Sequence, residues 1–105
     1  MDKENSRIAV IGIIIENREM AGRVNELLHQ YSQFIIGRMG IPYEKKQVNI
    51  ISVVLDAPSD VISALAGKMG RLPGVSSKAI YSRESSSEKT RGKEKGMEGD
   101  SQDGK

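Results

Sequence analysis

Two aliphatic segments constrain the fold of this chain more than any other feature. They read RIAVIGIII at residues 7–15 and QVNIISVVLD at residues 47–56, and both are rich in β-branched side chains. Short runs of this composition, bounded by polar clusters, predict buried β-strands. Because neighbouring side chains in a strand point to opposite sides of the sheet, these two strands would be apolar on both faces.

Two amphipathic helices are expected, one after each aliphatic strand. The first covers about residues 18–31, with Asn17 as its N-cap. The second begins at Pro58 and stops at Pro73-Gly74. Each helix carries one apolar stripe, formed by Met20, Val24, Leu27, Leu28 and Tyr31 in the first helix and by Ile62, Leu65, Ala66, Met69 and Leu72 in the second.

Two weaker extended segments complete the pattern. One covers about residues 33–41, where Gly37 and Gly40 predict a bulge or an irregular edge, and the other covers residues 75–82. After Pro42, a turn is expected at about residues 43–47, which carry three consecutive charged residues. The resulting order, β-α-β-β-α-β, predicts an α+β ferredoxin-like fold, which is a four-stranded antiparallel sheet with two helices on one face. In the usual strand order of this fold, 4-1-3-2, the two aliphatic strands are central.

The distribution of apolar residues sets the domain boundaries. Of the 39 apolar residues, 38 lie within residues 1–82 and only Met97 lies beyond them. We therefore expect a flexible N-terminus at residues 1–6, one folded domain at residues 7–82 and a disordered, charged, Ser- and Gly-rich tail at residues 83–105.

One face of the predicted sheet has nothing in this chain to cover it. Two helices cover one side of a four-stranded sheet, so several Ile and Val side chains on the other side would face water. The tail lacks the apolar residues to cover them. We expect a homodimer or tetramer formed through the sheet. The alternative is a structural module that binds a different protein through this face and takes no small ligand.

Composition excludes several kinds of chemistry. There is no cysteine, and His29 is the single histidine, which argues against a metal site, a thiol nucleophile and a catalytic triad. His29 is expected to be partly buried beside the stripe of the first helix. A net charge of +2 and the absence of a long apolar run argue against direct binding of nucleic acid or membrane. We expect a cytoplasmic, non-enzymatic protein that needs no cofactor.

Several segments together resemble a known family. The strand RIAVIGIIIENRE, the helical region VNELLHQYSQFIIGRMGIPY, the strand VNIISVVLDA and the closing SALAGKMGRLPGV are similar to those of regulators of the iron-only hydrogenase system. The resemblance covers residues 7–82. It implies a small ACT-like domain, similar to the C-terminal regulatory domain of nickel-responsive repressors, that oligomerises and serves hydrogenase expression or maturation in bacteria.

This resemblance implies a homo-oligomeric sensor of a small effector, or an adaptor for a hydrogenase-system protein. Only six residues precede the first strand, too few for the DNA-binding part of such repressors. If a ligand site exists, we expect it where Asn17, Arg18 and His29 of one chain approach a turn at Gly40–Tyr43 of another. Free N–H groups at the start of the first helix and the charge of Arg18 would hold an anionic group there.

Overall fold

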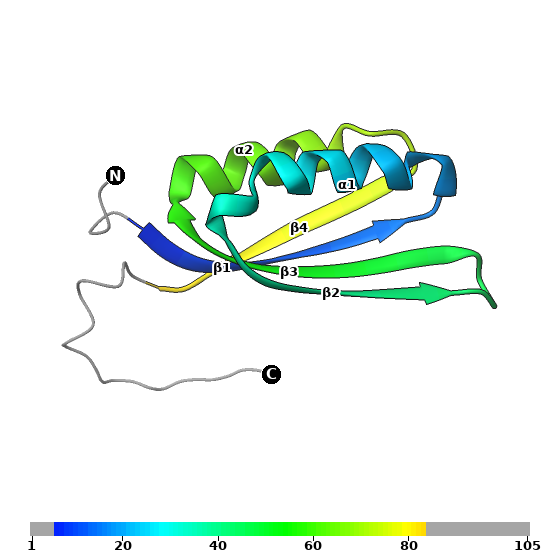
Figure 1. Cartoon of the computed structure of the whole chain (residues 1–105), viewed down its shortest axis with the longest axis horizontal. Helices are drawn as coiled ribbons and strands as arrows, with labels where there is room; N and C mark the ends of the chain where they lie inside the picture. Colours follow the sequence, from blue (N-terminus) through cyan, green and yellow to red (C-terminus); the bar gives the residue numbers. More distant parts are fainter. Residues whose placement is uncertain (1–5, 84–105) are drawn as a thin grey trace.

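The structure, a computed structural model, describes residues 6–83 (Figure 1). The predicted order of elements is confirmed, with two short 3-10 turns added. The predicted tail lies outside the described residues, apart from Arg83. In chain order the elements are β1 (Ser6–Ile15), η2 (Arg18–Met20), α1 (Ala21–Gln30), η3 (Ser32–Phe34), β2 (Ile35–Tyr43), β3 (Val48–Pro58), α2 (Ser59–Gly70) and β4 (Val75–Tyr81).

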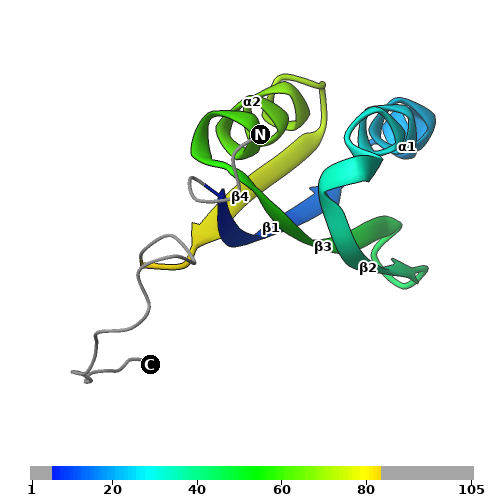
Figure 2. The same cartoon turned by 60° about the vertical axis from the view of Figure 1, so that its left-hand side comes forward.

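The four strands form one antiparallel sheet in the order β2-β3-β1-β4. The two aliphatic strands, β1 and β3, are therefore central, as the ferredoxin-like pattern predicts. Both helices lie on the same side of the sheet, and no described element lies on the other side (Figures 1 and 2). We call the side without helices the open face.

The core lies between the helices and one face of the sheet. On β1 it takes every second residue, Ala9, Ile11, Ile13 and Ile15, and all four are at most 1% exposed. Both predicted helical stripes are confirmed, because each of their residues is either buried or packed against the core. The fully buried members of the stripes are Val24, Leu28, Ile62, Leu65 and Met69.

Two element ends in the first half of the chain differ from the prediction. Ser6, predicted to lie in the flexible N-terminus, belongs to β1, and residues 1–5 lie outside the described residues. The first predicted helix is divided, because residues 18–20 form a 3-10 turn before α1 begins at Ala21. Asn17 caps this turn, and its side-chain Oδ1 accepts a hydrogen bond from the Glu19 N–H at 3.1 Å.

The predicted turn at Gly40–Tyr43 is wrong, because these residues continue strand β2. The turn predicted at residues 43–47 is confirmed at residues 44–47, where the Gln47 N–H donates to the Glu44 carbonyl at 3.1 Å. Pro42 is tolerated in β2 because this strand forms an edge of the sheet, where one side of the backbone needs no partner strand. The predicted bulge is confirmed as a register shift between Ile35 and Gly37.

Gly74 closes the connection between α2 and β4. Its carbonyl accepts hydrogen bonds from the N–H groups of Glu16 at 2.7 Å and Asn17 at 3.2 Å. Its φ is +72°, and a Cβ added there would lie 2.5 Å from the Asn17 Cβ. Glycine is thus required both by the backbone conformation and by the close approach of the loop after β1.

Gly74→Ala is expected to lower the free energy of unfolding by about 2 kcal/mol or more, since the left-handed conformation alone costs a non-glycine residue about 1–2 kcal/mol. For a domain of this size, this corresponds to a fall in Tm of about 10 °C. The control is Gly22→Ala in α1, where an added Cβ meets nothing within 4 Å. That variant should gain up to about 1 kcal/mol from helix propensity. Equal Tm values for the two variants would contradict this account of the turn.

Candidate functional site

The open face exposes most of the large apolar side chains that the described residues leave in contact with solvent. On the central strands, Ile8 is 40% exposed, Ile14 is 44% exposed and Ile50 is 37% exposed. The side chains of the edge strands that join them on the open face are Met39, Ile41 and Tyr43 of β2 and Ile80 of β4. Within residues 6–83, neither helix exposes a large apolar side chain.

Strand register places these side chains next to one another. Ile14 of β1 pairs with Ile50 of β3, and Ile50 pairs in turn with Ile41 of β2. A second row joins Ile80 of β4 to Val10 of β1, which pairs with Val54 of β3. Directly opposed side chains in a sheet lie about 5 Å apart, so the side chains within each row are in contact and form a continuous apolar line across the strands.

Polar groups interrupt this surface at its middle and at one end. Gly12 pairs with Lys78 on one side and with Ser52 on the other. An added Cβ at Gly12 would meet nothing within 4 Å, so no described side chain covers the backbone at the centre of the open face. Asp56, which pairs with Ile8, is the acidic residue of this face in β3. The open face therefore combines aliphatic rows with one cation, Lys78, and one carboxylate.

A surface of this kind binds protein more readily than it performs chemistry. Exposed apolar area forgoes about 25 cal/mol for each Å² left in water, so a patch of a few hundred Å² leaves several kcal/mol available for association. Residues 6–83 contain no cluster of His, Asp and Glu side chains that could hold a metal ion. In the same part of the chain, no helix has both the length and the apolar character needed to span a membrane.

Arg18 occupies one end of the molecule and is already partnered. Its guanidinium donates to the two carboxylate oxygens of Glu44 at 3.3 and 3.4 Å, and to the Val48 carbonyl at 3.4 Å. This contact links the loop after β1 to the turn between β2 and β3. An anionic ligand at Arg18 would therefore compete with Glu44, a residue that sequence reasoning did not associate with this site.

The five predicted ligand residues do not converge within one chain. Asn17 and Arg18 lie just before α1. Arg18 contacts Glu44, so both residues lie at the same end of the molecule as the β2–β3 turn. Tyr43 is the last residue of β2 beside that turn, and Gly40 lies three residues earlier in the same strand. His29 lies at the opposite end of α1, a helix of ten residues and therefore about 15 Å long.

His29 is exposed, so the expectation of a partly buried histidine is wrong. Successive residues of an α-helix are turned by about 100° from one another. His29 is therefore turned by at least that angle from both buried residues of α1, Val24 and Leu28. A ligand site that combines His29 with Arg18 stays a prediction that needs a second copy of the chain.

Sequence reasoning about the open face considered the central strands and missed the edge strands. Met39, Ile41 and Tyr43 alternate with Arg38, Gly40 and Pro42, and the alternation places the larger apolar side chains on the open face. The signal was present as a period of two residues. It was hidden because the segment was expected to end at Ile41 and to turn.

The fold and this surface define a class of protein: a small α+β ferredoxin-like domain with both helices on one side of the sheet and, among the described residues, no element covering the apolar face on the other side. A family model described as "TM1266-like: Iron-only hydrogenase system regulator, putative" matches residues 7–79. The chain belongs to this TM1266-like family.

A solved structure supports the same assignment. The uncharacterized protein TM1266 from Thermotoga maritima is 42% identical in sequence, with a TM-score of 0.69. The match covers 72% of this chain and 96% of the Thermotoga protein. No curated protein matches the chain.

Proposed function

We propose that this protein is a non-enzymatic regulator of the iron-only hydrogenase system that works as a homo-oligomer, with its subunits joined through the open face. Membership of the family supports the regulatory role. The observation that carries the proposed assembly is the continuous row of Ile14, Ile50 and Ile41, which lies on a face that no helix of residues 6–83 covers. Regulation by such a protein would pass through binding, either of a small effector or of a hydrogenase-system protein.

The charges of the open face favour a second copy as the occupant. A two-fold interface uses the same patch on both subunits, so any charge on the patch must be accommodated by the patch itself. Lys78 and Asp56 provide one charge of each sign, among aliphatic neighbours. A copy of the same face therefore offers a carboxylate for the ammonium and an ammonium for the carboxylate.

The exposed apolar side chains of the open face can contribute to the free energy of association. Interfaces of ordinary size bury about 800 Å² on each partner, and association costs roughly 4–15 kcal/mol in lost freedom of motion. Burying the exposed aliphatic side chains of two such faces would offset a cost of this order at about 25 cal/mol per Å². The alternative function, docking of a different protein on the same face, uses the same apolar contribution but does not explain the balanced charges.

Sedimentation equilibrium of the full chain at micromolar concentration tests the assembly. The chain mass is 11.5 kDa, and the expected result is a dimer or tetramer of this mass. A species of 11.5 kDa alone would contradict the proposal. A monomer that forms a stoichiometric complex only with a different protein would favour the docking alternative instead.

A further inference from the structure

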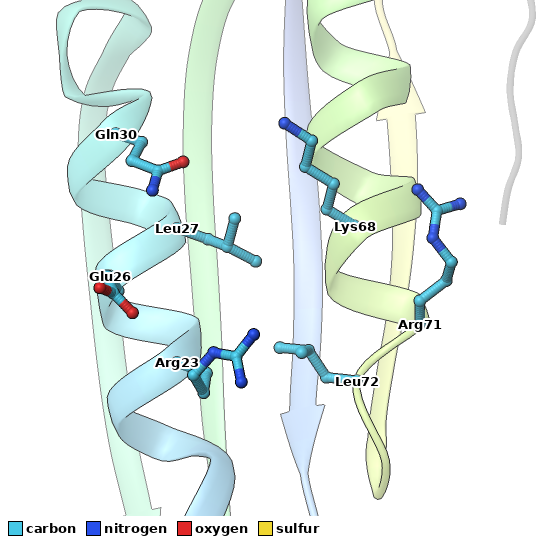
Figure 3. Close-up of a pocket in the computed structure, with 7 residues that line it drawn as sticks. All are labelled: Arg23, Glu26, Leu27, Gln30, Lys68, Arg71 and Leu72. Carbon is cyan, nitrogen blue, oxygen red and sulfur yellow. The ribbon is translucent and has the colours of Figure 1, made fainter.

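A groove lies between α1 and α2, on the layer of the molecule that faces away from the open face (Figure 3). Its volume is about 400 Å³, which lies within the range of small-molecule sites. Leu27 of α1 and Leu72, which follows α2, line it, and both also pack against the core. The groove therefore has an apolar floor that belongs to the rigid part of the fold.

Cationic side chains stand at the two ends of this floor. The Arg23 guanidinium projects from α1 into the space between the helices, toward Leu72 (Figure 3). Lys68 lines the groove from α2, nearer the C-terminal end of α1. Its ammonium donates to the Tyr31 hydroxyl at 2.8 Å and lies 5.2 Å from the centre of the Tyr31 ring.

Arg23 and Lys68 differ in how firmly neighbouring side chains hold them in place. Lys68 is held in place by Tyr31 and keeps two of its three N–H donors for another acceptor. Within residues 6–83, Arg23 makes no ion pair, so its planar set of donors is available to a carboxylate or a phosphate. One cation is thus fixed beforehand, and the other can adjust to the ligand.

The charge balance of the lining is positive. Arg71 adds a third cation, although its side chain extends away from α1 (Figure 3). Glu26 is the acidic residue of the lining, and Gln30 adds a neutral amide. Arg23 and Lys68, against the one carboxylate of the lining and beside two leucines, favour an anion with an apolar body over a neutral or cationic ligand.

We propose that this groove binds a small organic anion, either a phosphate ester or a carboxylate. Its apolar part lies on Leu27 and Leu72, and its anionic group is held by Arg23 or Lys68. Because the groove and the open face lie on opposite layers, the site does not depend on the oligomer proposed above. Either proposal can fail without the other.

Amide NMR of the full chain, titrated with phenyl phosphate and separately with benzoate, tests the site. Saturable shifts are expected at residues 23–30 and 68–72 with at least one of the two probes. The two arms distinguish a phosphate from a carboxylate. Phenol and inorganic phosphate, each lacking one half of the proposed chemistry, should bind at least about fivefold more weakly, because each loses either the charge-assisted hydrogen bonds or the apolar contact.

Two variants test the named cations. At least one of Arg23→Gln and Lys68→Gln, the one that removes the cation holding the anionic group, should weaken binding of the active probe by about fivefold to tenfold, as expected for one charge-assisted hydrogen bond at a partly exposed site. Lys46→Gln removes the same charge from the β2–β3 turn and should change the affinity by less than about twofold. Lack of saturable shifts up to about 10 mM of either probe, shifts that map elsewhere, or equal losses in all three variants would overturn the proposal.

Discussion

Ile14→Asp is expected to dissociate the proposed oligomer into 11.5 kDa subunits while leaving the domain folded. Ile14 is 44% exposed and lies between Ile50 and Ser76 on the open face, so a carboxylate there stays hydrated in a single subunit. In the assembled protein the same carboxylate would be buried without a partner. Burying an unpaired charge costs about 3–5 kcal/mol, and each 1.4 kcal/mol is about tenfold in affinity, so the dissociation constant should rise by about 100-fold or more.

Sedimentation equilibrium measures this effect, and far-ultraviolet circular dichroism checks that the variant is folded. Gln33→Asp is the control, because it adds the same charge in η3, outside the sheet. The control should keep the mass of the unmodified protein. An Ile14→Asp variant that is folded and has the unmodified mass would show that the subunits do not meet through the open face.

Ile62→Ala is expected to lower the free energy of unfolding by about 3 kcal/mol. Ile62 is fully buried in α2 and belongs to the core between the helices and the sheet. Removing three carbon atoms from such a position loses the transfer energy and leaves a cavity, and Ile→Ala changes of this kind cost about 2–5 kcal/mol. Urea denaturation at a fixed chain concentration measures the loss.

Val61→Ala, at the neighbouring position of the same helix, is the matched control. Val61 is only partly buried, so about 1 kcal/mol is expected from the smaller change and the lower burial. Both residues lie on the helical layer, so changes in the proposed sheet interface would not enter the comparison. Equal losses at the two positions would contradict the assignment of the helical stripe.

Periodicity in the sequence predicted the elements that are amphipathic or wholly apolar. Burial could be predicted at alternate positions of β1 and along the α2 stripe that contains Leu65 and Met69. In each element, the period of the strand or helix determines which side chains face the core. The order of elements then restricted the sheet to one usual arrangement. The strand order and the central places of the aliphatic runs were therefore predictable.

The course of β2 beyond Ile41 was not predictable from local signals. Pro42 and the glycines favour a turn when they are considered alone. They are accommodated in a strand because β2 is an edge, which is a property of the whole sheet. Because β2 continues to Tyr43, Met39 and Tyr43 both lie on the open face, and the apolar surface extends beyond the central strands.

Contacts between distant side chains were also beyond sequence reasoning. Arg18 and Glu44 are 26 residues apart, and their pairing depends on where the turn after β2 lies relative to the loop after β1. Lys68 and Tyr31, which close one end of the groove, are 37 residues apart. Neither pair can be recognised from hydrophobic periodicity in the sequence. Each pair joins two different elements, and the distance between those elements depends on how they pack in the folded domain.

The sequence by itself determined that both faces of the sheet are apolar and that two helices are available to cover one of them. Both features follow from the periodicity and composition of short segments, which do not depend on distant contacts. The tertiary structure decided which charged groups meet, which end of α1 holds His29, and where the helices leave a groove between Arg23 and Lys68. Those outcomes depend on how helices and strands pack in three dimensions, and no single segment of the chain encodes them.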